Sequence, residues 1–263
     1  MKSDTTLQSI VERLSARQYP FESLRERGTD VLVARAALPD GRSAVFKYWN
    51  RPGPRGAIRR FTRTGTAYRE RAALVHLRRN HLSVPEVYGL FHLRGAEARH
   101  TECLVEEDLG VCLDPTEALK EHIRNGDEEA VKRFESEIVR STGILVRSNL
   151  LDTDHRLPNY VVTPNGHPIR LDFELARRVL AWRLHPQQYG LMLGTLLGSY
   201  IFSVQPDQAR MERFAVAVLA ELKPPKRVLR VAKARIQGML ERQKKEIGMD
   251  TVFNAPWERG GKS

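Results

Sequence analysis

The stretch DTDHRLPNYVVTPNGHPIRLDFE, residues 152–174, sets three polar side chains at fixed intervals along the chain. Asp154 stands five residues before Asn159, and Asp172 follows thirteen residues after Asn159. Between the last two, strand-like runs flank a Pro-Asn-Gly turn at residues 164–166. The segment therefore predicts a loop, a short hairpin, and a further polar position directly after the hairpin.

Carboxylate and amide oxygens in this order suit the transfer of a phosphoryl group. That reaction needs oxygen ligands for Mg²⁺ and a carboxylate that orients the attacking hydroxyl. An Asp-x-x-x-x-Asn loop arises often by chance, whereas the loop, the hairpin and an apolar-Asp-Phe sequence together are considerably more specific. The alternative is structural: Asp154 would cap a loop, and Asp172 would cap a helix that begins near Glu174.

Three upstream elements occur in the order that this chemistry expects. Lys47 lies in the apolar run AVFKYW, where it can reach nucleotide phosphates, and Glu70 in YRERAALVHL can pair with it. LVEEDLG, residues 104–110, contains Glu106 and is predicted to connect a strand to a helix through backbone that binds an adenine. Taken singly, each has an ordinary alternative: an outward lysine, an exposed helical glutamate and an acidic surface loop.

Hydrophobic spacing predicts an α+β chain in two lobes. We expect a β-rich nucleotide-binding lobe over residues 1–109, a mostly helical lobe with the catalytic loop over 110–246, and a flexible tail over 247–263. The elements expected in the first lobe are a short helix around 7–14, strands at 31–38, 43–49, 86–93 and 101–109, an Arg- and Gly-rich connection at 51–65, and one main helix at about 66–80.

Composition limits the class of protein. Of the 263 residues, 41% are hydrophobic, which is enough for a core and excludes wholesale disorder. The 43 Lys and Arg residues against 32 Asp and Glu give a net charge of +11, which favours polyanionic partners. Two cysteines without metal-type spacing indicate a reducing compartment. Because the sequence offers no signal peptide and no convincing membrane span, we expect a cytoplasmic protein.

The positive charge is concentrated in two clusters. The first follows the second expected strand, and the second runs along a predicted C-terminal helix, where a solvated face is an equally good interpretation. For the first cluster a phosphate or anionic lipid is the favoured ligand, because too few aromatic residues are interleaved for a nucleic-acid platform. The clusters are Arg51, Arg55, Arg59, Arg60, Arg63, Arg69 and Arg71, and Lys223, Lys226, Arg227, Arg230, Lys233, Arg235, Arg242, Lys244 and Lys245.

The ordered polar set resembles that of the protein-kinase-like superfamily. Locally, the sequence resembles the bacterial lipopolysaccharide core kinases, the Kdo and heptose kinase family, over residues 31–178. Three features support this: the Arg-rich insert directly after FKYW, the run YRERAALVHLRRNHLSVPEVYGL, and DFELARR in place of a DFG activation segment. The resemblance implies a protein-kinase-like bilobal fold and an ATP- and Mg²⁺-dependent kinase.

In the first lobe, the resemblance assigns residues to the nucleotide. Lys47 would contact the phosphates, and Glu70 would hold Lys47. Glu106, in the connection between the lobes, and Gly28, the only glycine between the first strands, would complete the nucleotide site.

In the second lobe, the resemblance assigns residues to catalysis. Asp154 would orient the acceptor hydroxyl or act as its base, while Asn159 and Asp172 would bind Mg²⁺. The spacing to Asn159 selects Asp154 over Asp152 as the catalytic carboxylate, and Asp152 would hydrogen-bond within the loop.

Departures from the protein-kinase pattern narrow the acceptor. The chain has no GxGxxG loop and no APE-type segment, and Glu174 replaces the last glycine of DFG. These departures favour a small-molecule or glycan kinase over a regulated protein kinase. The resemblance implies phosphorylation of a sugar hydroxyl of a lipopolysaccharide core or a related anionic glycolipid, with peripheral contact at the inner membrane. The alternatives are an atypical, RIO-like protein kinase, another small-molecule kinase, and a non-catalytic pseudokinase scaffold. An antibiotic phosphotransferase is disfavoured, because cationic drugs need an acidic acceptor site.

Overall fold

The computed structural model of the chain describes residues 2–28, 30–93, 99–248, 253 and 256–258. The chain divides into an N-terminal unit, Met1–Arg79 with Val84–Gly110, and a C-terminal unit, Asn80–Ser83 with Val111–Ser263. Most of the predicted tail, residues 247–263, lies outside the described residues.

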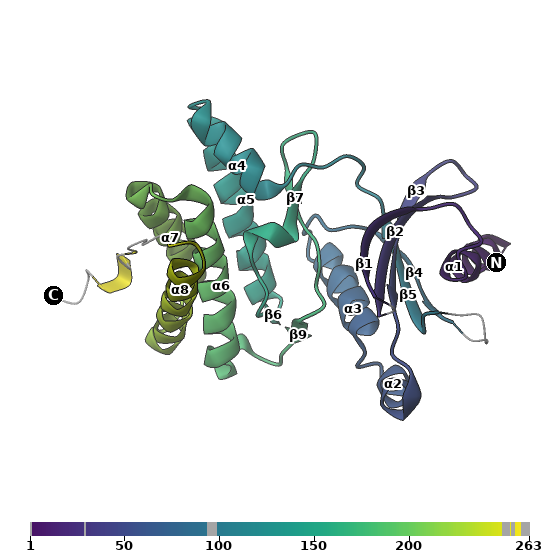
Figure 1. Cartoon of the computed structure of the whole chain (residues 1–263). Helices are drawn as coiled ribbons and strands as arrows, with labels where there is room; N and C mark the ends of the chain where they lie inside the picture. The colour runs from purple at the N-terminus through teal and green to yellow at the C-terminus, as the bar shows by residue number, and fades with distance from the viewer. Residues whose placement is uncertain (1, 29, 94–98, 249–252, 254–255, 259–263) are drawn as a thin grey trace. The chain divides into compact units, whose positions relative to one another are not determined.

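The N-terminal unit contains a five-stranded antiparallel sheet in the order β1-β2-β3-β5-β4 (Figure 1). In β2 and β3, every second residue is buried and faces the same side of the sheet. This alternation of buried and less buried positions favours an extended strand over a helix. The predicted strands are confirmed, and one further strand precedes them. The strands are β1 (Glu22–Arg27), β2 (Val31–Ala37), β3 (Ser43–Trp49), β4 (Val87–His92) and β5 (Glu102–Glu107).

Two helices pack on this sheet. Helix α1 (Lys2–Ser15) places Val11 and Leu14 in a core with Leu32 and Phe46, and the hydroxyl of Tyr48 donates to the carbonyl of Val11 at 2.9 Å. The main helix, α3 (Thr66–Arg79), packs against β4 and β5. Because successive strand residues alternate between faces, Lys47 projects away from the α1 side, toward α3.

Residues 51–65 are not the irregular connection that the sequence predicts. They contain a nine-residue helix, α2 (Gly53–Phe61), which projects from the unit in Figure 1. Proline within the first turn of α2 explains its start, since a proline there fixes φ without losing an internal hydrogen bond. Apolar residues in this helix recur at helical spacing, a pattern that the dominance of Arg and Gly in the segment conceals.

The C-terminal unit is mainly helical, as predicted. Helix α6 is almost entirely buried, and Gly190, Gly194 and Gly198 lie where a side chain would collide with α8, so these glycines allow the two helices to approach closely. Its helices are α4 (Pro115–Arg124), α5 (Glu128–Arg147), α6 (Pro186–Val204), α7 (Gln208–Leu222) and α8 (Lys226–Ile247), with short 3₁₀ turns η1 (Leu157–Asn159), η2 (Trp182–Leu184) and η3 (Pro256–Glu258).

Two short antiparallel strand pairs lie in the segment that carries the polar motif. Strand β6 (Leu150–Asp152) pairs with β9 (Ala176–Arg178), and β7 (Tyr160–Val162) pairs with β8 (Pro168–Arg170). The β7–β8 pair is the hairpin that the sequence predicts around its Pro-Asn-Gly turn. No helix in the described part of the chain is long and apolar enough to cross a membrane.

Candidate functional site

In the N-terminal unit, Lys47 forms the predicted ion pair with Glu70. The ammonium Nζ of Lys47, in the middle of β3, lies 2.6 Å from Oε1 of Glu70 on α3. A second carboxylate, which the sequence did not indicate as a partner, also contacts it: Oε2 of Glu106 on β5 lies 3.0 Å from Nζ. Both glutamates are buried. Lys47 is therefore an inward lysine, which excludes the alternative of a solvated edge-strand side chain.

Charge in this cluster is unbalanced. Burial alone would lower the pKa of Lys47, but Glu106 and Glu70 outweigh it and hold the pKa well above its ordinary value. One ammonium faces two carboxylates, and Oε1 of Glu106 has no hydrogen-bond partner among the described residues. The second carboxylate leaves excess negative charge in the cluster, so the cluster favours a further cation nearby.

Glu106 lies inside β5, in agreement with the strand expected at 101–109, so the connection predicted for the overlapping residues 104–110 is limited to those after Glu107. Its backbone is between those of Val45 and Val87 in the sheet, and β5 ends only at Glu107. The remaining connection within this unit is short: the amide of Gly110 donates to Oδ1 of Asp108 at 3.1 Å. Any backbone contact with a nucleotide base at this place would therefore come from the end of β5 and the turn after it.

Gly28 forms part of the turn that follows β1. It is exposed and has a positive φ of 53°, a conformation that favours glycine. Among the described residues, no hydrogen bond or ion pair links Gly28 to the Lys47 cluster, so its assignment to the nucleotide stays a prediction.

In the C-terminal unit, the loop after β6 holds Asp154 and Asn159 against each other. The amide Nδ2 of Asn159 donates to the backbone oxygen of Asp154 at 2.7 Å and to its carboxylate Oδ2 at 3.0 Å. The guanidinium Nε of Arg156 lies 3.2 Å from Oδ1 of Asp154 and 3.3 Å from Oδ1 of Asn159. Arg156 was not singled out from the sequence, although its place two residues after the aspartate was a usable signal.

A buried arginine organises the backbone of this loop. The guanidinium of Arg170, on β8, forms an ion pair with Asp152, and neither side chain is exposed to solvent. The same group donates to the backbone oxygens of Asn159 at 3.0 Å and Leu171 at 2.5 Å, and lies 3.4 Å from that of Asp154. One side chain thus joins the two strands and the loop that present the three candidate residues.

Asp152 supports the loop, as expected for a residue of this position. Its Oδ1 accepts a hydrogen bond from the backbone amide of Asp154 at 3.0 Å. Burial raises the pKa of the Asp152 carboxyl, and the charge of Arg170 opposes that rise. Asp152 is thus fully buried and held by these contacts, whereas the side chain of Asp154 is partly exposed.

Asp172 follows the hairpin in an unusual conformation. Its φ is +54°, which is uncommon outside glycine and is often found at functional positions. The backbone amide of the preceding Leu171 donates to the backbone oxygen of Asn159 at 2.8 Å, so Asp172 follows directly after the residue that is hydrogen-bonded to Asn159. No helix begins near Glu174, where the chain instead enters β9, and the helix-capping alternative for Asp172 is therefore wrong.

Asn159 and Asp172 fit the donor set that Mg²⁺ prefers. Both offer oxygen, and Mg²⁺ is commonly held by one or two protein groups together with substrate phosphates and water. The described residues contain no cluster of three or more Asp, Glu, His or Cys side chains suited to a metal. A metal at this place would therefore depend on the nucleotide for part of its coordination.

A buried histidine, His155, connects the loop of Asp154 to helix α5. His155 is buried, and its Nε2 lies 2.9 Å from Oγ1 of Thr142 on α5. Burial lowers its pKa well below the ordinary value, and the nearby charge of Arg170 adds to the effect. The ring of Tyr160 packs beside it, and the hydroxyl of Tyr160 lies 2.7 Å from Oγ of Ser141. The loop is thus fixed to α5 by uncharged hydrogen bonds.

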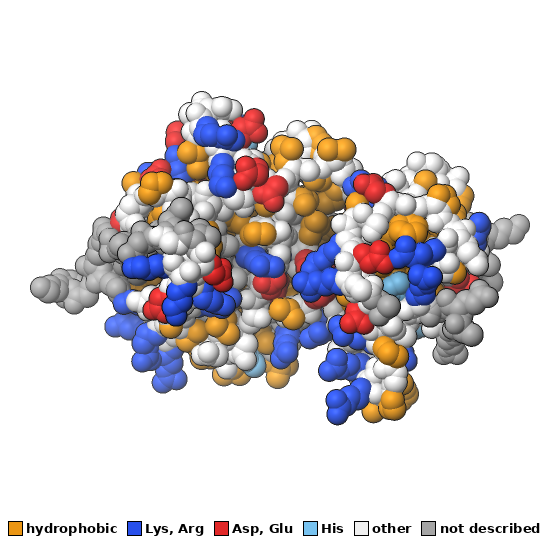
Figure 2. All heavy atoms as spheres, viewed as in Figure 1, with side chains coloured by type: hydrophobic (Ala, Val, Ile, Leu, Met, Phe, Trp, Pro, Cys, Tyr) orange, Lys and Arg blue, Asp and Glu red, His pale blue; other side chains and the backbone are white. Residues whose placement is uncertain are grey.

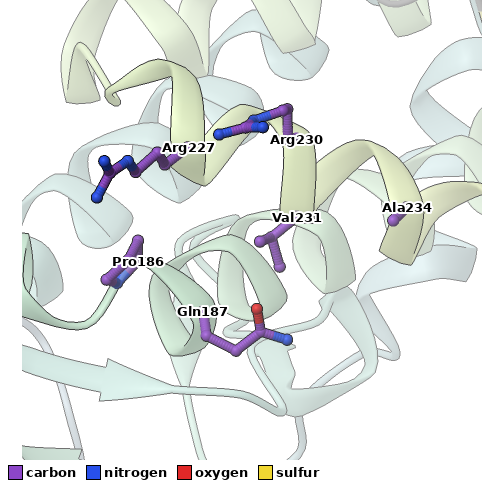
Figure 3. A pocket seen from close by; sticks show the side chains of 6 residues that line it. All are labelled: Pro186, Gln187, Arg227, Arg230, Val231 and Ala234. Atoms are coloured by element: carbon purple, nitrogen blue, oxygen red, sulfur yellow. The ribbon is translucent and has the colours of Figure 1, made fainter.

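The second basic cluster borders a shallow pocket of about 450 Å³. Figure 3 shows Arg227 and Arg230, from α8, on one side of it and Pro186 and Gln187, from the start of α6, on the other. Val231 and Ala234 complete the lining. None of the residues predicted for phosphoryl transfer borders this pocket.

Comparison with known proteins supports the fold. No family model matches the sequence, and no curated protein matches it. The chain is similar to the solved structure of WaaP in complex with acyl carrier protein, with a TM-score of 0.60 and 16% sequence identity over 88% of this chain and 91% of that chain. The fold is kinase-like. The predicted α+β class is confirmed, and an identity this low shows the shared fold alone.

Proposed function

We propose that this chain is an ATP- and Mg²⁺-dependent phosphotransferase with an alcohol group as acceptor. The observation that carries the proposal is the arrangement of Asp154, Asn159 and Asp172 around one hairpin, with the backbone oxygens of Asp154, Asn159 and Leu171 contacted by Arg170. The buried Lys47–Glu70 pair in the other unit supports it, because kinase-like folds use such a pair for nucleotide phosphates.

The proposed roles follow from the chemistry of each group. ATP and Mg²⁺ supply the transferable phosphoryl group and neutralise its charge. Residues 1–109 form the nucleotide-binding lobe, in which Lys47 orients the phosphates, Glu70 orients Lys47, and Gly28 and the backbone around Glu106 border the nucleotide. Residues 110–246 form the catalytic lobe.

Within the catalytic lobe, Asn159 and Asp172 would hold the metal through their oxygens. Asp154 would accept a hydrogen bond from the acceptor hydroxyl and take up its proton as the hydroxyl oxygen bonds to the γ-phosphorus, the bond from that phosphorus to the bridging oxygen breaks, and ADP leaves. Arg156, adjacent to both oxygen donors, supplies positive charge for the phosphoryl group in transfer.

The acceptor that we propose is a sugar hydroxyl of a lipopolysaccharide core or a related anionic glycolipid, at the cytoplasmic face of the inner membrane. The sequence resemblance to lipopolysaccharide core kinases, the net charge of +11 and the missing activation segment support it. A RIO-like protein kinase, another small-molecule kinase and a pseudokinase scaffold are the alternatives. Because the similar WaaP structure contains acyl carrier protein, that protein is a further candidate partner.

Nucleotide binding tests the proposal without knowledge of the acceptor. Addition of ATP with Mg²⁺ should raise the melting temperature by several degrees, since a ligand at about 100 times its dissociation constant stabilises by about 2.7 kcal/mol. The shift should shrink when Mg²⁺ is omitted and in Asp172→Ala, while exposed Glu129→Ala should keep it. No shift with any nucleotide would favour the scaffold alternative.

A further inference from the structure

Helix α2 carries an apolar stripe along one side. Pro54, Ala57, Ile58 and Phe61 follow one another at intervals of three, four and seven residues from the first, which places them on one face of a helix. In a water-soluble domain such a stripe normally faces the core. Whether the stripe is part of the core or an exposed surface therefore depends on the side on which α2 packs.

Helix α2 packs on its opposite side. Gly56 is its only buried residue, and a side chain there would meet the backbone oxygen of Arg51 at 1.9 Å, so this glycine allows the close approach. Arg60, from the same side, donates through its guanidinium to that oxygen at 3.0 Å. The apolar stripe lies on the side opposite this contact and is exposed, with Ile58 61% and Phe61 91% accessible to solvent.

The charge around the stripe has one sign. No acidic residue occurs between residues 41 and 69, and none of the arginines at 51–63 forms a salt bridge with a carboxylate in the described part of the chain. Figure 2 shows basic and hydrophobic side chains gathered on the projecting helix. The five arginines are Arg51, Arg55, Arg59, Arg60 and Arg63.

We propose that α2 is an interfacial anchor that binds the surface of an anionic membrane. Phe61 and Ile58 enter the boundary between headgroups and acyl chains, and the flanking arginines contact lipid phosphates. A bilayer suits this helix because it accepts an apolar stripe without a shaped groove and lets long basic side chains reach the phosphate level. A single aromatic ring among the arginines does not form a stacking surface for nucleic acid.

This inference deepens the proposed function, since a glycolipid acceptor lies in a membrane, but it needs neither nucleotide nor acceptor to be tested. The full chain should co-sediment with vesicles of phosphatidylethanolamine and phosphatidylglycerol and not with neutral phosphatidylcholine vesicles. Added salt should weaken the binding, because it screens exposed charges.

Two variants test the two parts of the anchor. Arg55→Ser with Arg59→Ser should weaken vesicle binding about 25-fold, at about fivefold for each arginine. Ile58→Ser with Phe61→Ser should weaken it about tenfold or more. The matched controls are Leu180→Ser, at a site that is 96% exposed, and Arg227→Ser with Arg230→Ser on α8, which should bind like the unmodified chain.

The outcomes separate the anchor from the enzyme. Three results would contradict the proposed anchor: no binding of the chain to anionic vesicles, equally strong binding to neutral vesicles, or α2 variants that bind vesicles like the unmodified chain. Preferential binding to an acidic protein or to RNA, with vesicles unable to compete, would also overturn it. The α2 variants should keep the ATP-dependent rise in melting temperature. If the unmodified chain binds vesicles but no nucleotide, the membrane anchor is supported and the proposed kinase activity is contradicted.

Discussion

The guanidinium of Arg170 and the carboxylate of Asp152 form an ion pair from which solvent is completely excluded. Burial of two charges is costly unless further hydrogen bonds satisfy them. Here those bonds go to backbone oxygens of the loop that presents Asp154 and Asn159. The pair therefore fixes the position of the proposed catalytic residues without contacting a substrate.

Replacement of Arg170 should cost both stability and activity. Arg170→Met leaves the buried Asp152 without its partner, and we expect the free energy of unfolding in urea to fall by about 3–5 kcal/mol. Arg170→Met with Asp152→Asn should recover much of that stability, yet its kcat should stay low because the backbone contacts are still missing. A double variant with normal kcat would show that Arg170 does not position the loop.

Variants at Lys47 should separate its contribution to stability from its contribution to activity. Lys47→Met leaves Glu70 and Glu106 buried without a cation, so stability should fall by about 3–5 kcal/mol. Addition of Glu106→Gln should restore part of it in thermal unfolding, since one buried charge is removed. Phosphoryl transfer should remain about 10²–10³-fold below that of the unmodified chain in both variants. Recovery of activity along with stability would contradict the role of Lys47.

Arg156 should act on turnover more than on stability. Arg156→Ala should lower kcat about 10²–10³-fold, with a smaller change in KM, because its charge is proposed to act on the phosphoryl group in transfer. Arg156→Lys should recover only part of the loss, since a lysine cannot make two planar contacts. Arg230→Ala, an exposed arginine on α8, is the control. An unchanged kcat in Arg156→Ala would remove Arg156 from the mechanism.

The buried His155 predicts how stability depends on pH. Its pKa in the folded chain lies below the ordinary value, so below about pH 6.5 the unfolded chain binds a proton that the folded chain does not. The free energy of unfolding should therefore fall as pH decreases, by up to about 1.4 kcal/mol per pH unit from this group. His155→Gln should lose that contribution in urea titrations between about pH 6.5 and 5. Equal slopes for both chains would contradict it.

The sequence predicted the fold where its signals are periodic. Alternating apolar residues indicated β2 and β3, and the order of polar motifs located the hairpin around 164–166. The Lys47–Glu70 pair was also expected, because the order of the polar motifs resembles that of the protein-kinase-like superfamily. The strands and the hairpin depend on short-range pattern, which the chain displays directly.

The contacts that sequence reasoning missed are long-range. Arg170 reads as an ordinary strand residue, and only the folded hairpin shows that it reaches Asp152, eighteen positions earlier. Glu106 was expected in a strand that leads into a connection, but its contact with Lys47 inside the sheet was not foreseen. Helix α2 was not predicted, because glycine and arginine dominate its segment. Its few apolar residues are exposed, so they do not mark a buried helix face.

The central claim is most directly tested by transfer of labelled γ-phosphate from ATP to extracted lipopolysaccharide. We predict Mg²⁺-dependent labelling of the glycolipid, and not of added protein, by the unmodified chain, and a loss of about 10²–10⁴-fold in Asp154→Ala with the ATP-dependent melting shift retained. Labelling at the normal rate in Asp154→Ala, or no labelling by the unmodified chain, would contradict the account.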